Sequence, residues 1–291
     1  MKDSLLTEKN KRDIINFIKE KKYADILILL EKKKTDHAGT AKTKDKRFVI
    51  SEIVRHIIDT SANPEKDYFT AGNFFCKRKE DAAKEIGVML IWRAYKFNTK
   101  KTESILLKIA DDDNWEVREY AGTAFANTIF HNKEFYETVM KWTKHHSGNV
   151  RRAVVFSAIG LRDKKNLAKA FALFEPLLFD DSKYVRKNLG PFILGSYFAN
   201  KFPEETVNRL KKWSKIRDEN VRWNIAMSFN NSFGNRNPEL ALDVLKNLTG
   251  DQNIIVRRAV ISTLRFLSKR HKKLVEGFVK KNNLKLIKEA D

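Results

Sequence analysis

Basic side chains recur at one position along this 291-residue chain, immediately after a Val-Arg pair. They are Arg152, Lys187 and Arg258. One residue along a helix is a rotation of about 100°, so each of these side chains points away from the arginine that precedes it. If the helices that carry them stack, the three cations form a stripe with a spacing of roughly 10 Å, the width of one helix pair. Such a stripe can follow the phosphates of a nucleic acid backbone.

The Val-Arg pairs that precede these cations recur every 33 to 36 residues. The valines are Val117, Val150, Val185, Val221 and Val256. A period of this length is typical of stacked helical hairpins. Short turn residues such as Asp180, Asp181 and Ser182 stand before each valine, where their side chains accept hydrogen bonds from the free N–H groups that open a helix. The pattern predicts an all-α fold, a right-handed α-solenoid of HEAT-like helical hairpins.

We expect the arginines of the Val-Arg pairs to have a structural role. In stacks of this kind such an arginine often bonds an aspartate of a neighbouring turn, which predicts an internal ladder of Arg118, Arg151, Arg186, Arg222 and Arg257. Two tryptophans, Trp142 and Trp213, occupy a position that leucine or isoleucine fills in other repeats, so we expect them in the core. Trp115 and Trp223 lie off that position and are candidates for stacking on a base or a sugar.

The charge of the chain indicates a polyanionic partner. There are 58 Lys and Arg residues against 37 Asp and Glu residues, a formal net charge of +21. Nucleic acid is the leading candidate, with an anionic membrane surface or an acidic protein as alternatives. The basic residues are spread along the repeats rather than gathered on one amphipathic helix, which disfavours the membrane.

The remaining composition favours a soluble cytoplasmic protein. A single cysteine, Cys76, excludes an internal disulfide and fits a reducing compartment. The first residues lack an apolar leader, and the apolar runs are too short to span a bilayer. We therefore expect a cytoplasmic location and no membrane partner.

We predict a single domain over residues 1–291. It comprises N-terminal helices over 1–100, regular repeats over 101–269 and a basic C-terminal cap over 270–291. The segment 31–47 has no apolar periodicity, which predicts a mobile loop. Two interpretations of this loop stay open, a solvated linker and a basic finger that touches phosphates.

Signatures of metal and cofactor chemistry are missing from the sequence. There is no Gly-rich phosphate loop, no His-Glu-x-x-His and no Cys/His cluster with zinc spacing, so we expect no cofactor and no metal. The carboxylates at the turns are mostly explained as helix caps. A single positioned carboxylate would nevertheless suffice to hydrolyse the glycosidic bond of an alkylated purine, because the cationic base is already a good leaving group.

Two segments carry a resemblance to a known family. Asn-Val-Arg-Arg-Ala-Val-Val-Phe at 149–156 and Val-Arg-Lys-Asn-Leu-Gly-Pro-Phe-Ile-Leu at 185–194 resemble the HEAT-like-repeat DNA alkylation-repair glycosylases of the AlkD/AlkC type. The resemblance covers most of residues 70–270. It implies a C-shaped solenoid that holds duplex DNA in a basic concave cleft. There, N3- or N7-alkylated purines are excised without flipping the base into a pocket.

The same resemblance suggests which residues act. By its phasing, the family's Trp-x-x-x-Asp falls on Asn114 and Arg118 and a later DNA-facing tryptophan falls on Pro191, while Arg152 keeps the family's basic residue. The neighbouring register offers Trp115 and Glu119 with i, i+4 spacing. If the chain is a glycosylase, the resemblance implies that Glu119 is the catalytic carboxylate, with Asp112 or Asp113 as substitutes, and that Trp115 leans on the deoxyribose.

The sequence thus predicts a monomeric DNA-repair protein of the alkylation-repair type that binds alkylated or distorted double-stranded DNA. The residues expected to contact DNA are Arg152, Lys187, Arg258, Arg222, Lys84, Arg93, Trp115 and Trp223. Whether the chain is an enzyme, a DNA glycosylase, stays open. The alternatives are a non-catalytic binder of bent or branched DNA and a HEAT scaffold for an acidic protein or RNA.

Overall fold

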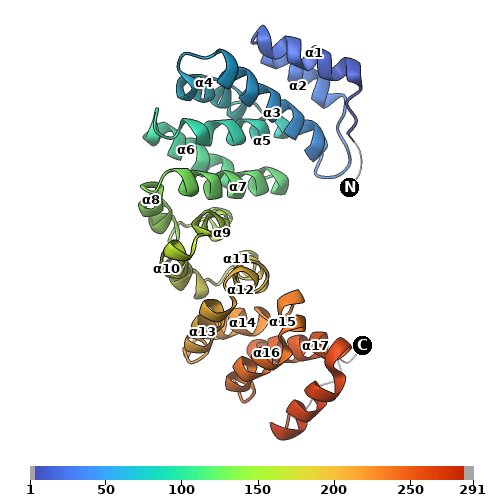
Figure 1. Cartoon of the computed structure of the whole chain (residues 1–291), viewed down its shortest axis with the longest axis vertical. Coiled ribbons are helices and arrows are strands. Elements are labelled where there is room, and N and C mark those ends of the chain that lie inside the picture. The colour runs from blue at the N-terminus through green and yellow to red at the C-terminus, as the bar shows by residue number, and fades with distance from the viewer. Residues whose placement is uncertain (1–3, 285–291) are drawn as a thin grey trace. The chain divides into compact units, whose positions relative to one another are not determined.

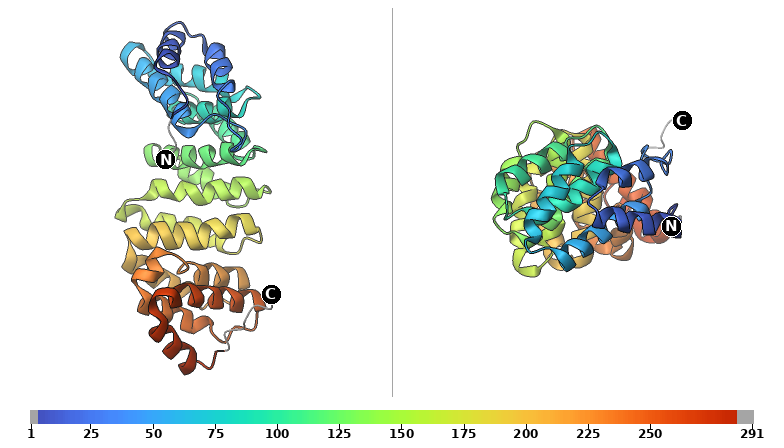
Figure 2. Two further views of the ribbon diagram at one scale, coloured as in Figure 1. Left: turned by 90° about the vertical axis from the view of Figure 1, so that its right-hand side faces the viewer. Right: turned by 90° about the horizontal axis from the view of Figure 1, so that it is seen from above.

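The computed structural model describes residues 4–284, and the regular secondary structure in that range is helical apart from one isolated bridge between Lys34 and Ala41. The chain forms two compact units, Met1–Leu161 and Arg162–Asp291. Within each unit, consecutive helices form hairpins that lie side by side (Figures 1 and 2). The predicted all-α solenoid is confirmed, and the single domain over 1–291 stays a prediction.

The first unit holds nine α-helices within its described residues, followed or interrupted by two short 3₁₀ turns. The helices are α1 (Glu8–Lys19), α2 (Tyr23–Glu31), α3 (Thr43–Thr60), α4 (Pro64–Cys76), α5 (Asp81–Ile91), η1 (Trp92–Ala94), α6 (Thr99–Ala110), α7 (Trp115–His131), α8 (Phe135–Trp142), α9 (Gly148–Ser157) and η2 (Ala158–Leu161). Among them, α5 packs against α7 and α7 packs against α9, so α7 lies at the centre of the later part of the unit.

The second unit repeats the hairpin arrangement. Its helices are η3 (Lys164–Asn166), α10 (Leu167–Leu178), α11 (Lys183–Asn188), η4 (Leu189–Phe198), α12 (Ala199–Lys201), α13 (Pro203–Trp213), α14 (Glu219–Met227), α15 (Ser232–Arg236), α16 (Pro238–Leu245), η5 (Lys246–Leu248) and α17 (Ile254–Lys281). The last residues of the predicted C-terminal cap, 285–291, lie outside the described residues.

Turn residues set the helix starts much as the sequence predicts. The side chains of Asn114, Ser147, Asp218 and Asn253 each accept a hydrogen bond from a main-chain N–H in the first turn of α7, α9, α14 and α17, respectively. The five repeat valines are fully buried. The spacing of these valines along the chain is therefore the spacing at which successive repeats contribute a residue to the core.

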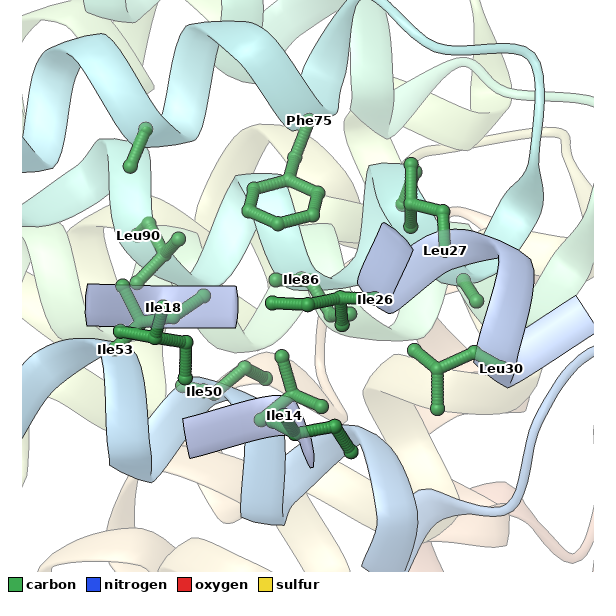
Figure 3. Packing of buried hydrophobic residues seen from close by; sticks show 14 of the residues in the cluster. Ile14, Ile18, Ile26, Leu27, Leu30, Ile50, Ile53, Phe75, Ile86 and Leu90 are labelled. Carbon is green, nitrogen blue, oxygen red and sulfur yellow. The ribbon is translucent and has the colours of Figure 1, made fainter. Parts of the chain in front are cut away.

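The N-terminal helices bury an aliphatic cluster of their own (Figure 3). The cluster includes Ile14 and Ile18 of α1, Ile53 of α3, Phe75 of α4 and Ile86 of α5, and Ile18 lies beside Ile53. Each of these side chains is almost fully removed from water. The burial of five large apolar side chains, each worth about 1.5–3 kcal/mol, holds the beginning of the chain against α3 to α5.

The prediction of a mobile loop over 31–47 is wrong for its second half. Helix α3 begins at Thr43, and Thr40, Asp45 and Lys46 are among the most buried residues of the unit. The side chain of Asn114 also donates a hydrogen bond to the carbonyl oxygen of Ala38, at 2.8 Å. Apolar periodicity misses this segment because its buried contacts are polar and charged.

Helix α11 continues as the π-helical segment η4, which contains Pro191. Proline cannot donate a helical hydrogen bond, and a wider turn tolerates that loss. Its carbonyl oxygen accepts from the side chain of Asn231 at 3.0 Å, and Ser228 donates to the carbonyl of Gly190 at 3.1 Å. The two segments approach so closely that a Cβ atom on Gly195 would lie 2.1 Å from the Ser228 carbonyl oxygen.

We expect Gly195→Ala to destabilise the second unit by about 1–3 kcal/mol, because the added methyl group must push main-chain atoms apart. The matched control is Gly277→Ala on α17, where nothing lies within 4 Å of the new Cβ. That variant should be neutral or more stable by up to about 1 kcal/mol. Urea unfolding followed by circular dichroism measures both, and equal midpoints for the two variants would contradict the packing described here.

Candidate functional site

The arginines of the Val-Arg pairs are used for structure. Arg118 donates to the carbonyl oxygens of Asp112 and Asp113 at 2.6 and 2.8 Å, and Arg151 and Arg257 bond the carbonyls of the turns before their own helices in the same way. Arg222 donates to the carbonyl oxygen of Ile216 at 3.3 Å and also pairs with the carboxylate of Asp251 in the next turn, which is the contact that the predicted ladder requires. The carbonyl contacts tie each of these turns to the helix that follows it.

A pocket of about 790 Å³ lies between α3, α5 and α7 of the first unit. Its apolar lining comes from Ile50, Val54 and Ile58 of α3 and Met89 of α5. Aromatic and charged side chains complete it, namely His37, Arg47, Arg55, Asp59, Arg93, Trp115, Glu116, Glu119 and Tyr120. The volume falls in the range of roughly 300–1,000 Å³ that is typical of small-molecule sites.

Helix α3 has two apolar faces, and this explains the pocket. Val49, Ile53 and Ile57 are buried against the core. Ile50, Val54 and Ile58 follow them by one residue and line the pocket, and Ile58 is 63% exposed. A helix with one apolar stripe would leave this side polar. The second apolar stripe, formed by Ile50, Val54 and Ile58, is the sequence signal that could have revealed the pocket. The predictions from the sequence did not include it.

Trp115 and Glu119 lie one turn apart on α7 and both line this pocket. The indole of Trp115 is 44% exposed and meets the ring of His37 edge-on, with ring centroids 5.2 Å apart. The carboxylate of Glu119 forms an ion pair with the guanidinium of Arg152 from α9. Arg152 is buried and lies over the ring of Phe156, 4.5 Å from its centroid.

In the structure, the residues of the neighbouring register, Trp115 and Glu119, lie at the pocket. Arg118 is directed into the turn before α7, and Trp115 and Glu119 stand at the pocket wall. The Arg152 ion pair holds Glu119 in one orientation, and the side chain of Glu119 stays 41% exposed. A fixed, accessible carboxylate beside an exposed indole can stabilise a cation that develops next to it.

Beneath the pocket, a buried ion cluster joins three helices. The ammonium group of Lys46 from α3 lies 2.5 Å from a carboxylate oxygen of Glu85 in α5 and 2.9 Å from one of Glu116 in α7. Thr40 donates to Glu85 at 3.1 Å. The ring of Tyr120, which also lines the pocket, lies 5.1 Å from the Lys46 nitrogen.

Burial in this cluster changes the pKa values of Glu85 and Tyr120. Burial raises the pKa of the Glu85 carboxyl to about 7, although the Lys46 ammonium opposes the rise. Burial also raises the pKa of the Tyr120 hydroxyl, with the Glu85 and Glu116 carboxylates adding to the effect. Two carboxylates thus share one ammonium ion.

The other predicted residues of the first unit have partners. Lys84 bridges Asp81 and Asp112, with nitrogen–oxygen distances of 3.2 and 2.8 Å. Arg93 lines the pocket and stacks over the ring of Trp92 at 4.4 Å. Asp113 is exposed and uses its main-chain carbonyl to accept from Arg118, while its side chain is not part of the pocket lining.

In the second unit, Lys187 and Arg258 are both exposed. Lys187 lies 5.3 Å from the ring centroid of Tyr184, and neither cation forms an ion pair within the described part of the unit. Arg222 differs, because its pairing with Asp251 leaves its side chain only 19% exposed. Trp223 is partly buried under the guanidinium of Arg186, 5.6 Å from the ring centroid.

Residues 4–284 contain neither a membrane-spanning helix nor a metal-ligand cluster. No helix there combines the length and the apolar character that crossing a membrane needs. Nor do three or more His, Cys, Asp or Glu side chains in that range converge as a metal site would require. The Cys76 thiol is buried, and burial raises its pKa far above the ordinary value, which makes it unreactive.

The chain matches a known protein family and resembles solved helical-repeat structures. Residues 46–193 and 189–289 match the family described as DNA alkylation repair enzyme. The crystal structure of YibA from Escherichia coli is similar over 97% of this chain and 94% of its own, with 16% identity and a TM-score of 0.41. A computationally designed armadillo repeat protein for modular peptide recognition is similar over 75% of this chain and 99% of its own, with 18% identity and a TM-score of 0.28. No curated protein sequence matches the chain.

The raised pKa of Glu85 gives a pH dependence with a definite sign. Between the ordinary carboxyl value of 4.5 and about 7, the folded protein keeps a proton that the unfolded chain loses, so this group makes the protein less stable as the pH rises. Relative to Glu85→Gln, the wild type should lose on the order of 2 kcal/mol between pH 5 and pH 8. Urea unfolding at the two pH values measures the difference. Glu137→Gln, at an exposed position of α8, should run parallel to the wild type.

Proposed function

Because the chain belongs to the DNA alkylation repair enzyme family, we propose that it is a DNA glycosylase that releases N3- or N7-alkylated purines from duplex DNA. The observation that supports this activity most directly is the group of Trp115, Glu119 and Arg152 at the pocket of the first unit. It joins an exposed aromatic ring with an oriented carboxylate, which are the two features that a cationic sugar intermediate needs beside it.

The proposed chemistry needs little from the protein because the alkylated purine carries a positive charge. The bond between the sugar carbon C1′ and the base nitrogen breaks, and its electron pair neutralises the departing base. Positive charge then develops on the deoxyribose, where the Glu119 carboxylate stabilises it and Trp115 covers the sugar. A water molecule adds to C1′ and gives its proton to the carboxylate. Arg152 acts as a positioning residue, since it contacts Glu119 rather than the substrate.

DNA contacts are proposed for exposed cations of the second unit. Lys187 and Arg258 each follow the arginine of a Val-Arg pair, and that arginine is engaged in the structure of the repeat. The following side chain is therefore available to phosphates. We assign Arg222 a structural role within this proposal, because Asp251 already neutralises it. Lys84 is assigned likewise, since it bridges two aspartates.

The double variant Lys187→Gln and Arg258→Gln should bind duplex DNA more weakly and with a shallower dependence on salt. Each lost phosphate contact lowers the slope of log affinity against log salt concentration by about 0.9. The control is Lys212→Gln with Lys246→Gln, which removes the same charge from two exposed lysines, one on α13 and one in η5. Gel shifts from 50 to 200 mM salt measure both slopes, and identical slopes would exclude the proposed phosphate contacts.

Glu119→Gln should reduce the release of 7-methylguanine from methylated DNA by at least about 100-fold, since removing one group that stabilises transition-state charge costs a factor of this size. DNA affinity should stay within about twofold. Glu134→Gln, at an exposed position outside the pocket, should match the wild type in both assays. Equal release by the Glu119 and Glu134 variants would remove Glu119 from the mechanism. Binding to bent or branched DNA without any release would instead support the non-catalytic alternative.

A further inference from the structure

The segment between α2 and α3 forms a fixed hairpin. Its two sides meet at the bridge between Lys34 and Ala41, and the main-chain N–H of Thr35 donates to the carbonyl oxygen of Thr40 at 3.1 Å. At its tip, Ala38 has a positive φ of 57°, a conformation that costs an alanine roughly 1–2 kcal/mol. Contacts with the rest of the unit must therefore hold the tip in place.

Asn114 supplies that contact and fixes the hairpin at the pocket. Its side-chain nitrogen donates to the carbonyl oxygen of Ala38 at 2.8 Å and to a carboxylate oxygen of Asp81 at 2.7 Å. The hairpin in turn places His37 at the pocket wall, where the imidazole meets the Trp115 indole edge-on. His37 is exposed, and its ring nitrogens form no hydrogen bond with any residue between 4 and 284.

The arginines of the pocket are engaged to different degrees. Arg55 pairs with the carboxylate of Glu52, and Arg93 donates to the main-chain carbonyl of Met89. Arg47 also lines the pocket and is exposed, but its guanidinium has neither a hydrogen-bond nor an ion-pair partner among the described residues. Arg47 and the imidazole of the hairpin are thus two donors at one pocket that the fold leaves unused.

The charges around these two donors favour an anion. The carboxylates of Glu116 and Glu119, which also line the pocket, are already paired with Lys46 and Arg152, respectively. They therefore do not neutralise the guanidinium or compete for the imidazole. A guanidinium and an imidazole bind phosphate oxygens through charge-assisted hydrogen bonds.

We propose that His37 and Arg47 bind a phosphate of the DNA strand that carries the alkylated base, next to the deoxyribose that Trp115 covers. This inference rests on the proposed function and adds a contact that fixes the sugar against Glu119. It requires no displacement of the base, because both contacts are made to the backbone. Of the two interpretations of segment 31–47, it takes the phosphate-binding finger.

Neutralising one phosphate at a time tests this assignment. The probe is a duplex with a single 7-methylguanine, in which each phosphate near the lesion is replaced in turn by an uncharged methylphosphonate. Replacement at the bound position should weaken binding by the wild type about tenfold, as expected for the loss of a charge-assisted hydrogen bond. The double variant His37→Gln and Arg47→Gln should bind the unmodified backbone at least about tenfold more weakly and should be insensitive to replacement at that position.

The matched control is Arg12→Gln with His146→Gln, which removes the same two groups from exposed positions outside the pocket. It should keep the wild-type affinity within about twofold and the same sensitive position. Equal sensitivity in both double variants, or no sensitive position in the wild type, would overturn the inference.

Base release from the same duplex separates this inference from the proposed function. If the wild type shows the sensitive position and releases no 7-methylguanine, the glycosylase proposal fails and the phosphate site stands. If it releases 7-methylguanine and no position is sensitive, the phosphate site alone is excluded. A wild type that does not bind the duplex contradicts both.

Discussion

The contact on which the first unit depends is the buried ammonium group of Lys46, which α3 places between carboxylates of α5 and α7. Removing one partner of a buried ion pair leaves an uncompensated charge and commonly costs 3–5 kcal/mol. These three helices therefore cannot separate or slide independently. Because Glu116 stands between Trp115 and Glu119 in the chain, the same contact sets the rotation of α7 and the direction in which both residues face.

Neighbouring cations on the second helices of the repeats are held differently. The arginine of each Val-Arg pair is held by main-chain carbonyls or by a side chain of a turn, so its charge is used inside the repeat. The residue that follows is rotated by about 100° and is not held in this way. Arg152 is the exception, because it is buried and paired with Glu119. Among the predicted DNA-contacting cations, Arg152 is the one whose ion pair fixes the orientation of Glu119.

Membership of the alkylation-repair family and the pocket together suggest how this chain departs from the expected pattern. The strict phasing of the resemblance places an arginine, Arg118, where a carboxylate is expected. A shift of one residue brings Glu119 to the pocket wall, where it pairs with Arg152, a basic residue one repeat later. Helix α3 then supplies an opposite wall with an apolar second face. The proposed catalytic carboxylate and the apolar wall opposite it thus come from different helices that the Lys46 cluster joins.

The sequence by itself determined the repeat, because valines at a constant period must share one buried face in stacked hairpins. It also determined most turn positions. It did not separate structural from exposed cations, because Arg152, Arg222 and Lys84 were expected to contact DNA and instead pair with carboxylates. Only the tertiary structure decided the site. Lys46, Glu85 and Glu116 are far apart in the chain, and charged residues carry no periodic signal that predicts their burial. Likewise, Glu119 rather than Arg118 lies at the pocket because of the rotation of α7, which is set by contacts with α5 and α9 and by the Lys46–Glu116 pair from α3. No local sequence pattern contains that rotation.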